Sequence, residues 1–421
     1  MFKKILSLVL VAVMCVGACL AFASCGDDND EGVLDKVELG EKFTVPSDFK
    51  IGFICLHDKN STYDKNFIDA AEAVKEYLGM TDEQVIIKTN VPEEGDDCFN
   101  AAEDLVNRGC KIVFADSFGH EANMIKAAQK YPEVQFCHAT GTQALVQENL
   151  PNYHNAFASI YEGRYLAGVA AGLKLNEMIE DKKITADQAI IGYVGAFPYA
   201  EVVSGYTSFY LGARSVCPSA TMKVRYTSSW YDYDAEMASA KSLIEQDKCV
   251  LISQHADSMG APTACEQAGV PNVSYNGSTV KDCPDTFIVS SAINWQPYYY
   301  YIIDAVVNNK TIAANWVGTI ATGSVVLSAV NKNAAAKGTA EEIRKLAEEM
   351  KNGTLHVFAT TGNNKITVGG QDVTTYLADV KDYGDYAGET EVISGGYFHE
   401  SEYRSAPYFD LRIDGITELN K

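Results

Sequence analysis

Residues 50–79, KIGFICLHDKNSTYDKNFIDAAEAVKEYLG, decide the fold of this 421-residue chain. The segment opens with an apolar run over residues 50–56, which predicts a buried β-strand. An amphipathic helix is expected next, because apolar residues then recur at helical spacing: Phe67, Ala70, Ala71, Val74 and Leu78. Gly79 ends this predicted helix. A strand followed by a helix of this length is the repeating unit of a parallel, doubly wound sheet.

The same strand and helix unit recurs along the chain in two series. Further strands of the first series are predicted at residues 85–88, 112–115 and 134–138. After a helix over residues 165–178, the second series has predicted strands at 190–194, 222–226, 250–253, 273–275 and 287–289. We therefore expect an α/β protein with two doubly wound, parallel-sheet lobes. The tail from residue 353 is rich in Tyr, Gly and Thr and has a less regular pattern.

The N-terminus combines a charged start, an apolar stretch and a cysteine. Lys3 and Lys4 precede the apolar run, and small residues stand directly before Cys25, which an acidic spacer follows. This order predicts a signal peptide over residues 1–24, cut at a lipobox, with lipidation of Cys25. A diacylglycerol there would hold the mature chain at the membrane, because each buried CH₂ contributes about 0.8 kcal/mol. Cleavage without lipid and an uncleaved membrane anchor stay open, since Phe22 replaces the usual Leu and the apolar run could span a bilayer.

Composition limits the class of partner. Residues 25–46 are acidic and poor in aromatic residues, which predicts a flexible acidic tether. The formal net charge of -22 argues against nucleic acid and against electrostatic adhesion to anionic lipid. Eight cysteines follow Cys25 without any C-x-x-C pair: Cys55, Cys98, Cys110, Cys137, Cys217, Cys249, Cys265 and Cys283. Because several of them lie in apolar strand-like runs, we expect mostly free, buried thiols.

The loops after the predicted strands mix aromatic and acidic residues. Ligands of open parallel sheets bind beyond the carboxyl ends of the strands. The residues in question are Asp64, Phe67, Asp116, Phe118, Phe197, Trp230, Tyr231, Asp232 and Asp257. A flat heterocycle with hydroxyl groups would suit such a site, since aromatic rings stack on it and carboxylates accept its N–H and O–H groups. Simple packing of these aromatic rings at the rim of the sheets stays open as an alternative.

Histidines offer a second interpretation of the same loops. Four of them follow predicted strands: His57, His120, His138 and His255. A metal site that combines them with Asp116 or Asp257 stays open as an alternative. Catalytic motifs are scarce, because the chain has no Walker A, G-x-G-x-x-G, H-E-x-x-H or G-x-S-x-G pattern. We therefore expect a binding protein that needs no cofactor and is not an enzyme.

Six motifs together resemble one known family. They are DSFG at 116–119, HATG at 138–141, IYEGRYLAG at 160–168, GARSV at 212–216, SWYD at 229–232 and NWQPYY at 294–299. In this combination, over about residues 50 to 330, the chain resembles the basic membrane protein family of lipoproteins. That family includes purine nucleoside receptor lipoproteins of ABC importers. The resemblance implies a type I periplasmic-binding-protein fold, in which two lobes close on a ligand cleft.

The resemblance also implies a set of ligand contacts from both lobes. The sequence DKNF at 64–67 resembles the family's first ligand loop, in which Phe67 would stack on the base while Asp64 and Asn66 read its edge. Trp230 matches the aromatic residue of the opposite lobe. The other implied contacts are Asp116 after the third strand, Asp257 facing the sugar, and Phe118 and Asn276 in their loops.

Two departures from the family bear on the ligand. Residues 275–278, YNGS, stand where many nucleoside-binding relatives carry an Asp-rich loop, and Ile68 stands where Asn is common. Loss of a carboxylate weakens recognition of ribose hydroxyl groups. The resemblance therefore leaves a free base or another small heterocycle open as the ligand.

These inferences combine into one expected organisation. Beyond the signal peptide and the tether, lobe 1 would comprise residues 47–159 and about 290–325, and lobe 2 residues 160–289 and about 326–421. The expected function is that of an extracytoplasmic, lipid-anchored solute-binding protein of an ABC importer. It would bind a purine nucleoside or base between the lobes and deliver it to permease and ATPase subunits encoded as separate chains. A surface lipoprotein with an adhesion or signalling role stays open as an alternative.

Overall fold

The computed structural model describes residues 32–147 and 149–420. Cys25, the predicted signal peptide and the first part of the predicted tether lie outside these residues, so lipidation stays a prediction. Within the described ranges, no helix has both the length and the apolar character needed to cross a bilayer. By their contacts, residues 31–421 group into one unit.

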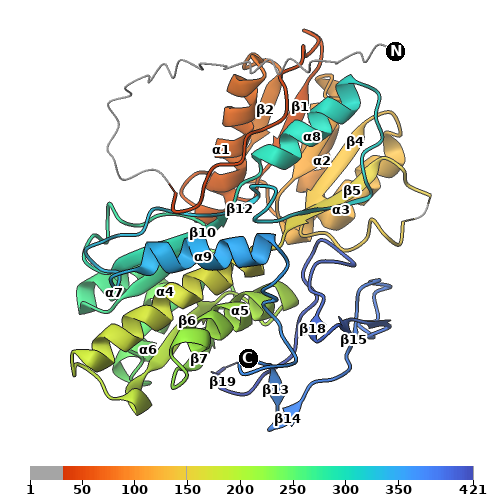
Figure 1. Ribbon diagram of the computed structural model, residues 1–421. Helices are drawn as coiled ribbons and strands as arrows, with labels where there is room; N and C mark the ends of the chain where they lie inside the picture. Colours follow the sequence, from red (N-terminus) through yellow and green to blue (C-terminus); the bar gives the residue numbers. More distant parts are fainter. Residues whose placement is uncertain (1–31, 148, 421) are drawn as a thin grey trace, which may run out of the picture. The chain divides into compact units, whose positions relative to one another are not determined.

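Lobe 1 is built on a six-stranded parallel sheet with the order β11-β5-β4-β3-β1-β2 (Figure 1). Its strands are β1 (Ile51–Ile54), β2 (Val85–Lys88), β3 (Ile112–Ala115), β4 (Gln135–Ala139), β5 (Tyr153–Ala158) and β11 (Asn315–Gly318). β1 and β3 are buried along their whole length, as expected for strands covered on both faces. The four strands predicted for this part of the chain are therefore present.

Two strands of this sheet were not predicted, β5 and β11. β5 reads YHNAFA, so the polar residues His154 and Asn155 interrupt its apolar pattern although both are buried. The side chain of Asn155 accepts a hydrogen bond from Ala144 N at 2.7 Å, and the His154 ring contacts Gln135 Oε1 at 2.8 Å. Their burial is tolerated because these polar atoms have partners.

The helices of lobe 1 are α1 (Thr62–Tyr77), α2 (Asp97–Asn107), the 3-10 helix η1 (Phe118–His120), α3 (Glu121–Lys130) and α8 (Gln296–Val307). α1 begins at Thr62, five residues before the predicted repeat at Phe67, because the Ser61 side chain accepts a hydrogen bond from Asp64 N and caps the first turn. Its apolar face, including Val74, packs into the core. α1 therefore starts directly at the carboxyl edge of the sheet, where a ligand site is expected.

Lobe 2 is built on a seven-stranded sheet with the order β12-β10-β9-β8-β6-β7-β19. Its strands are β6 (Ile190–Gly195), β7 (Thr221–Tyr226), β8 (Leu251–His255), β9 (Asn272–Tyr275), β10 (Phe287–Ile293), β12 (Val325–Leu327) and β19 (Ile416–Glu418). All neighbouring strands pair in parallel except β10 and β12, which are antiparallel. The five strands predicted for the second series are all present.

Helices cover both faces of this sheet. They are α4 (Ile160–Glu180), the 3-10 helix η2 (Ala186–Gln188), α5 (Ala200–Val216), α6 (Tyr233–Glu245), α7 (Gly260–Ala268) and α9 (Thr339–Lys351). α4 and α5 approach each other at two glycines. A Cβ atom at Gly168 would lie 1.9 Å from Phe209 O, and one at Gly212 would lie 2.0 Å from Tyr165 O. Glycine is therefore required at both positions for the two backbones to pack this closely.

The chain passes between the two sheets three times: after β5, after β10 and after β11. β10 and β12 both belong to the sheet of lobe 2, so α8 and β11 form an excursion into lobe 1 between residues 294 and 324. Two hydrogen bonds tie the crossing segments together: Ser159 N donates to Gly318 O at 2.7 Å, and Ile320 N donates to Glu162 Oε2 at 2.7 Å. These crossings are the positions at which the lobes can rotate relative to each other.

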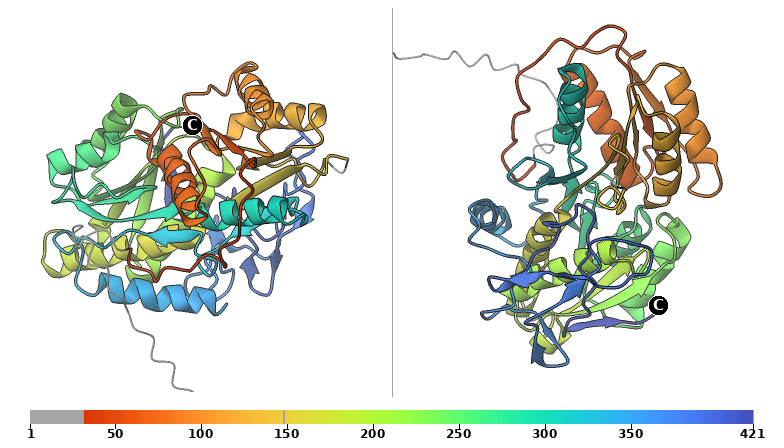
Figure 2. Two further views of the ribbon diagram at one scale, coloured as in Figure 1. Left: turned by 90° about the horizontal axis from the view of Figure 1, so that it is seen from above. Right: turned by 90° about the vertical axis from the view of Figure 1, so that its right-hand side faces the viewer.

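The tail after α9 forms short hairpins and then the edge strand β19. The hairpins pair β13 (Thr367–Val368) with β14 (Gln371–Asp372), β15 (Leu377–Ala378) with β16 (Thr390–Glu391), and β17 (Ile393–Ser394) with β18 (Tyr397–Phe398). Figures 1 and 2 show this tail, drawn in dark blue, alongside lobe 2. Phe358 stacks on Phe409 at 4.3 Å between ring centroids, so the tail has its own apolar contacts.

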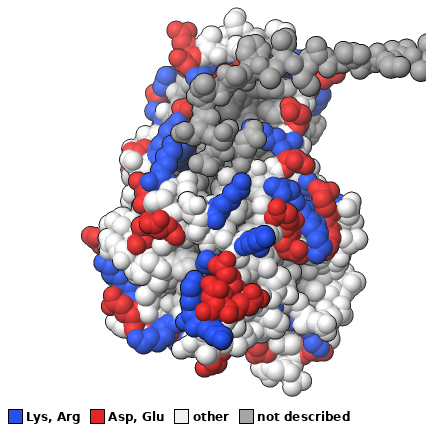
Figure 3. All heavy atoms as spheres, turned by 60° about the vertical axis from the view of Figure 1, so that its left-hand side comes forward, with Lys and Arg blue, Asp and Glu red and all other residues white. Residues whose placement is uncertain are grey.

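Charges and thiols agree with the expectations from composition. On the face drawn in Figure 3, Lys and Arg side chains of the described residues lie among Asp and Glu side chains. Lys59, for example, pairs with both Asp69 and Glu72. The eight cysteines after Cys25 are free and buried, as predicted.

Candidate functional site

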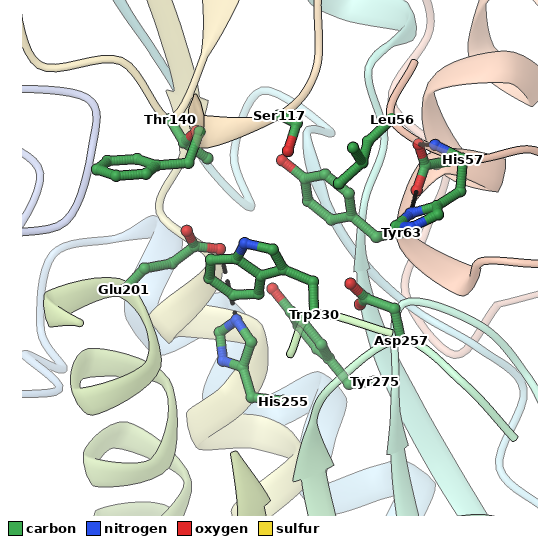
Figure 4. Close-up of a pocket in the computed structure, with 12 residues that line it drawn as sticks. Leu56, His57, Tyr63, Ser117, Thr140, Glu201, Trp230, His255, Asp257 and Tyr275 are labelled. Carbon is green, nitrogen blue, oxygen red and sulfur yellow. Dashed lines mark hydrogen bonds and ion pairs between the residues drawn. The ribbon is translucent and has the colours of Figure 1, made fainter. Parts of the chain in front are cut away.

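A pocket lies where the carboxyl ends of the two sheets face each other, and we call it the interlobe pocket. Its lining residues from lobe 1 are Leu56, His57, Tyr63, Asp64, Ser117, Phe118 and Thr140, and those from lobe 2 are Glu201, Trp230, His255, Asp257 and Tyr275. Figure 4 shows Tyr63, Trp230, Asp257 and Tyr275 around a common space. Its free volume is about 20 Å³. That is room for roughly one water molecule, so the lobes are closed on each other in this structure.

Asp64 is a carboxylate of the pocket whose two oxygens are both held by hydrogen bonds. It lies in the first turn of α1, where Oδ1 accepts from His57 N at 2.7 Å and Oδ2 accepts from Ser61 Oγ at 2.6 Å. Burial by itself would raise the pKa of Asp64, but these hydrogen bonds and the His57 ring outweigh it and lower the pKa. Asp64 is therefore the carboxyl group that stays ionised at the site.

Asp116 lies beneath the pocket and not on its lining. Its Oδ1 accepts from Leu56 N at 3.1 Å, while Oδ2 is buried without a hydrogen-bond partner. Burial, followed by the nearby Asp64 charge, raises the pKa of Asp116 well above its ordinary value. The raised pKa favours the protonated form of Asp116, which supports the pocket from below.

The aromatic residue that α1 presents to the pocket is Tyr63. Its hydroxyl donates to Asp116 O at 2.9 Å, and its ring meets the Phe67 ring edge-on at 4.8 Å. The structure does not bring Phe67 itself to the pocket. That ring is 1% exposed and stacks on Trp295 at 4.5 Å in the core of lobe 1. Phe67 and Tyr63 are one helical turn apart, so Phe67 supports the ring that faces the ligand space.

Lobe 2 supplies Trp230 to the same space. Its half-buried ring packs edge-on against Phe197 at 5.1 Å. Phe197 in turn stacks on Tyr199 at 5.0 Å, and Tyr199 lies 5.8 Å from the exposed Phe118 of lobe 1. The predicted residues Trp230 and Phe118 therefore both line the pocket, from opposite lobes.

Asp257 and Asn276 join lobe 2 to lobe 1 at the edge of the pocket. Thr62 N donates to Asp257 O at 3.1 Å, and Asn66 Nδ2 donates to Asn276 Oδ1 at 3.4 Å. Asn276 Nδ2 donates to Asp257 Oδ1 at 3.3 Å. Asp257 lines the pocket, whereas Asn66 and Asn276 form a polar contact between the lobes beside it. Asn276 has φ 64°, a left-handed conformation that Asn tolerates better than most residues.

Burial changes the protonation of Asp257 as well. Burial, followed by the charges of Asp64 and Glu236, raises the pKa of Asp257 well above its ordinary value. Of the three aspartates at this site, only Asp64 has a lowered pKa. The lowered pKa of Asp64 favours a carboxylate acceptor in the pocket, and the raised pKa of Asp257 favours a carboxylic acid that can donate a hydrogen bond.

The floor of the pocket contains His255, which the sequence suggested as a metal ligand, together with Glu201, Tyr275 and Arg164, which sequence reasoning did not assign to the site. His255 Nε2 lies 3.4 Å from Glu201 Oε1, and the His255 ring packs at 4.4 Å from the Tyr275 ring. Beneath Tyr275 lies the fully buried Arg164, whose guanidinium is 5.1 Å from the ring centroid. Arg164 donates to neutral acceptors, among them Ser253 Oγ at 2.7 Å. The position of Arg164 within the 160–168 motif was the sequence signal that could have indicated a role at the site.

The predicted histidine metal site is not assembled in the described part of the chain. The four histidines divide between the pocket and the interior: His57 and His255 line the pocket, while His120 and His138 are buried against backbone carbonyls. The group whose ligand atoms converge within 4.8 Å consists of Cys55, Asp64 and Asp116. Burial raises the pKa of both the Cys55 thiol and Asp116, so the protonated forms are favoured and a cation is not.

The fold and the enclosed pocket define a solute-binding protein with two α/β lobes. The sequence matches the family described as ABC transporter substrate-binding protein PnrA-like, or Bmp, over residues 53–361, and the chain belongs to this family. Its members are not enzymes, and the solute-binding proteins of ABC importers act outside the cytoplasm.

Individual relatives agree with this membership. The chain is 32% identical to a purine-binding protein of Brucella abortus over 76% of this chain and 86% of the relative. It is also 32% identical to a Haloferax volcanii protein that carries the provisional name ABC transporter glucose-binding protein, over 59% of each chain. In fold it resembles an ABC transporter solute-binding protein from Conexibacter woesei, with a TM-score of 0.59, 18% identity, and coverage of 75% of this chain and 99% of that one. The predicted family, fold class and non-enzymatic character are therefore confirmed.

Proposed function

We propose that this substrate-binding protein captures a purine nucleoside or a purine base in the interlobe pocket and delivers it to an ABC permease. The observation that carries the proposal is the pairing of aromatic rings with carboxyl groups from both lobes around one enclosed space. Trp230 and Tyr63 would stack on the ring, while Asp64 and Asp257 would bond to its polar edge or to a sugar. The Brucella relative's name, purine-binding protein, also supports this choice of ligand.

Capture requires the lobes to open. A ligand pocket for a small organic molecule typically has about 300–1,000 Å³, far more than the free volume of this closed form. Opening would break the Asn66–Asn276 and Thr62–Asp257 hydrogen bonds, which lie at the contact between the lobes. Closure around a ligand would re-form them, and in this proposal Asn66 and Asn276 act as latches instead of ligand contacts.

The proposal extends to the anchor. We propose that Cys25 carries the lipid and that residues 25–46 tether the two lobes near the permease in the membrane. Mass spectrometry of the membrane-extracted protein would show a diacylglyceryl modification of Cys25. A mature N-terminus at another residue, without lipid, would contradict it.

The deciding experiment is isothermal titration calorimetry with purine nucleosides, the free bases and glucose. We expect binding of at least one purine compound and none of glucose. Binding of glucose without any purine would overturn the proposed ligand class and leave the family membership untouched. Zinc belongs in the same series, because tight zinc binding that Asp116→Asn abolishes would favour the metal-binding alternative instead.

A further inference from the structure

A second cavity lies far along the chain from the interlobe pocket, and we call it the tail cavity. Its walls come from the first turn of α4, the end of α9 with the segment that follows it, and the β17–β18 hairpin with residues beyond it. The free volume is about 170 Å³. An engineered protein cavity of about 150 Å³ holds benzene, so a small organic molecule fits here without any rearrangement.

The tail cavity is acidic. Glu162 from α4 and Glu402 from the tail both line it, and no Lys or Arg is among its lining residues in the described ranges. Glu162 Oε2 accepts one hydrogen bond, from Ile320 N, and burial raises the pKa of Glu162 to about 7. A bound cation would offset this desolvation and favour the ionised form of the carboxyl group.

Aromatic rings form much of the remaining wall. Tyr397 packs between two histidine rings, with its centroid 3.7 Å from that of His356 and 3.9 Å from that of His399. His399 Nδ1 also lies 2.7 Å from Glu402 Oε2, so this carboxylate enters the wall with a histidine partner. Tyr161 packs against Phe358 at 5.3 Å, and its hydroxyl donates to Glu400 O at 3.1 Å. Carboxylates beside phenol and phenyl rings are the side-chain types that recognise ammonium groups, through charge and cation–π attraction.

We propose that the tail cavity binds a small organic cation, an amine or a quaternary ammonium compound, between the carboxylates of Glu162 and Glu402 and beside the ring of Tyr161. The site needs the tail, because Tyr397 and Glu402 lie beyond residue 361, where the family match ends. A bare metal ion is a poorer occupant. In the described part of the chain, three ligand side chains converge only at Cys55, Asp64 and Asp116, none of which lines this cavity.

Calorimetry of the full mature chain tests the proposal, with choline and ethanolamine as probes and 3,3-dimethylbutanol as the uncharged isostere of choline. We expect at least one of the two cations to bind and the isostere not to bind. Glu162→Gln and Glu402→Gln should each weaken cation binding by about tenfold or more. Glu348→Gln is the matched control, because this carboxylate of α9 is 60% exposed and pairs with Lys351 outside the cavity.

Three results would overturn the proposal: no binding of either cation at millimolar concentration, equal binding of the isostere, or an equal loss in Glu348→Gln. Glu162→Gln keeps the acceptor for Ile320 N, and Glu402→Gln alters only the tail, so a folding defect in one variant leaves the other to decide. Purine binding should be unchanged in Glu402→Gln. Failure of cation binding therefore says nothing against the proposed function of the interlobe pocket.

Discussion

Replacement of Trp230 by alanine tests the ligand clamp most directly. Stacking of a base on an aromatic side chain is worth about 1–3 kcal/mol by alanine substitution. If Trp230 stacks on the purine ring, affinity should fall by about 5- to 150-fold. Calorimetry with the tightest-binding purine of the panel measures this loss.

Thermal unfolding of the ligand-free protein separates binding from folding. The Trp230 ring is half-buried and makes its closest ring contact with Phe197, at 5.1 Å. An aromatic pair contributes about 0.5–1.5 kcal/mol beyond the area it buries, and a fully buried Trp costs about 3–5 kcal/mol when replaced by Ala. Because Trp230 is only half-buried, the free energy of unfolding should fall by less than about 3 kcal/mol. Tyr233→Ala is the control, since this exposed ring is three residues away and outside the pocket. Unchanged affinity in Trp230→Ala, or the same loss in Tyr233→Ala, would refute the assignment.

Three further predictions concern the surroundings of the pocket. Gly168→Val should destabilise the protein by at least about 1–3 kcal/mol by overpacking α4 against Phe209 O, as measured by urea unfolding, and an unchanged midpoint would contradict the close packing. Asn276→Asp should weaken purine binding about tenfold, because it removes the amide donor to Asp257 and adds a negative charge beside it; calorimetry with unchanged affinity would exclude the latch. The pKa of Asp116 is raised in the folded state. Its protonated form therefore contributes fully to stability below the unfolded-state pKa of about 3.9. This contribution is lost as pH rises through the folded-state pKa. Asp116→Asn should therefore flatten the decline of stability above about pH 4, and an equally steep decline in urea titrations would show that another group causes it.

The sheets could be predicted from the sequence wherever apolar runs were uninterrupted. β5 was missed because a buried strand that carries His154 and Asn155 is recognisable only once the partners of their side chains are known. β11 was missed because it adds to the sheet of lobe 1 from a distant part of the chain, through pairing with β5. Such pairing depends on tertiary contacts that local periodicity does not encode.

The residues of the site also divide into those that local sequence patterns predict and those whose position depends on tertiary contacts. Ligands of parallel sheets bind beyond the carboxyl ends of the strands, and this rule predicted that Asp64, Phe118, Trp230 and Asp257 lie at one site. All four residues line the interlobe pocket. The same rule does not show whether Tyr63 or Phe67 faces the ligand, since both lie on one face of α1. The position of Trp295, which stacks on Phe67, decides which ring is covered. Sequence patterns likewise assigned no role to Glu201, which reaches the pocket from the first turn of α5.

The protonation pattern of the pocket offers a way to distinguish a nucleoside from a free base. Asp257 has a raised pKa because it is buried near Asp64 and Glu236. A ribose hydroxyl that donates to Asp257 would favour the ionised carboxylate and release its proton, whereas a ring nitrogen that accepts from the carboxylic acid would retain it. Titrations in two buffers of different ionisation enthalpy measure this proton transfer directly. We expect proton release when nucleosides bind and little proton transfer when bases bind. In Asp257→Asn, we expect no proton release with either kind of ligand. Identical heats in both buffers for every ligand would show that Asp257 does not change its protonation on binding, and the sugar contact would then have to be made by Asp64, the one aspartate that is already ionised.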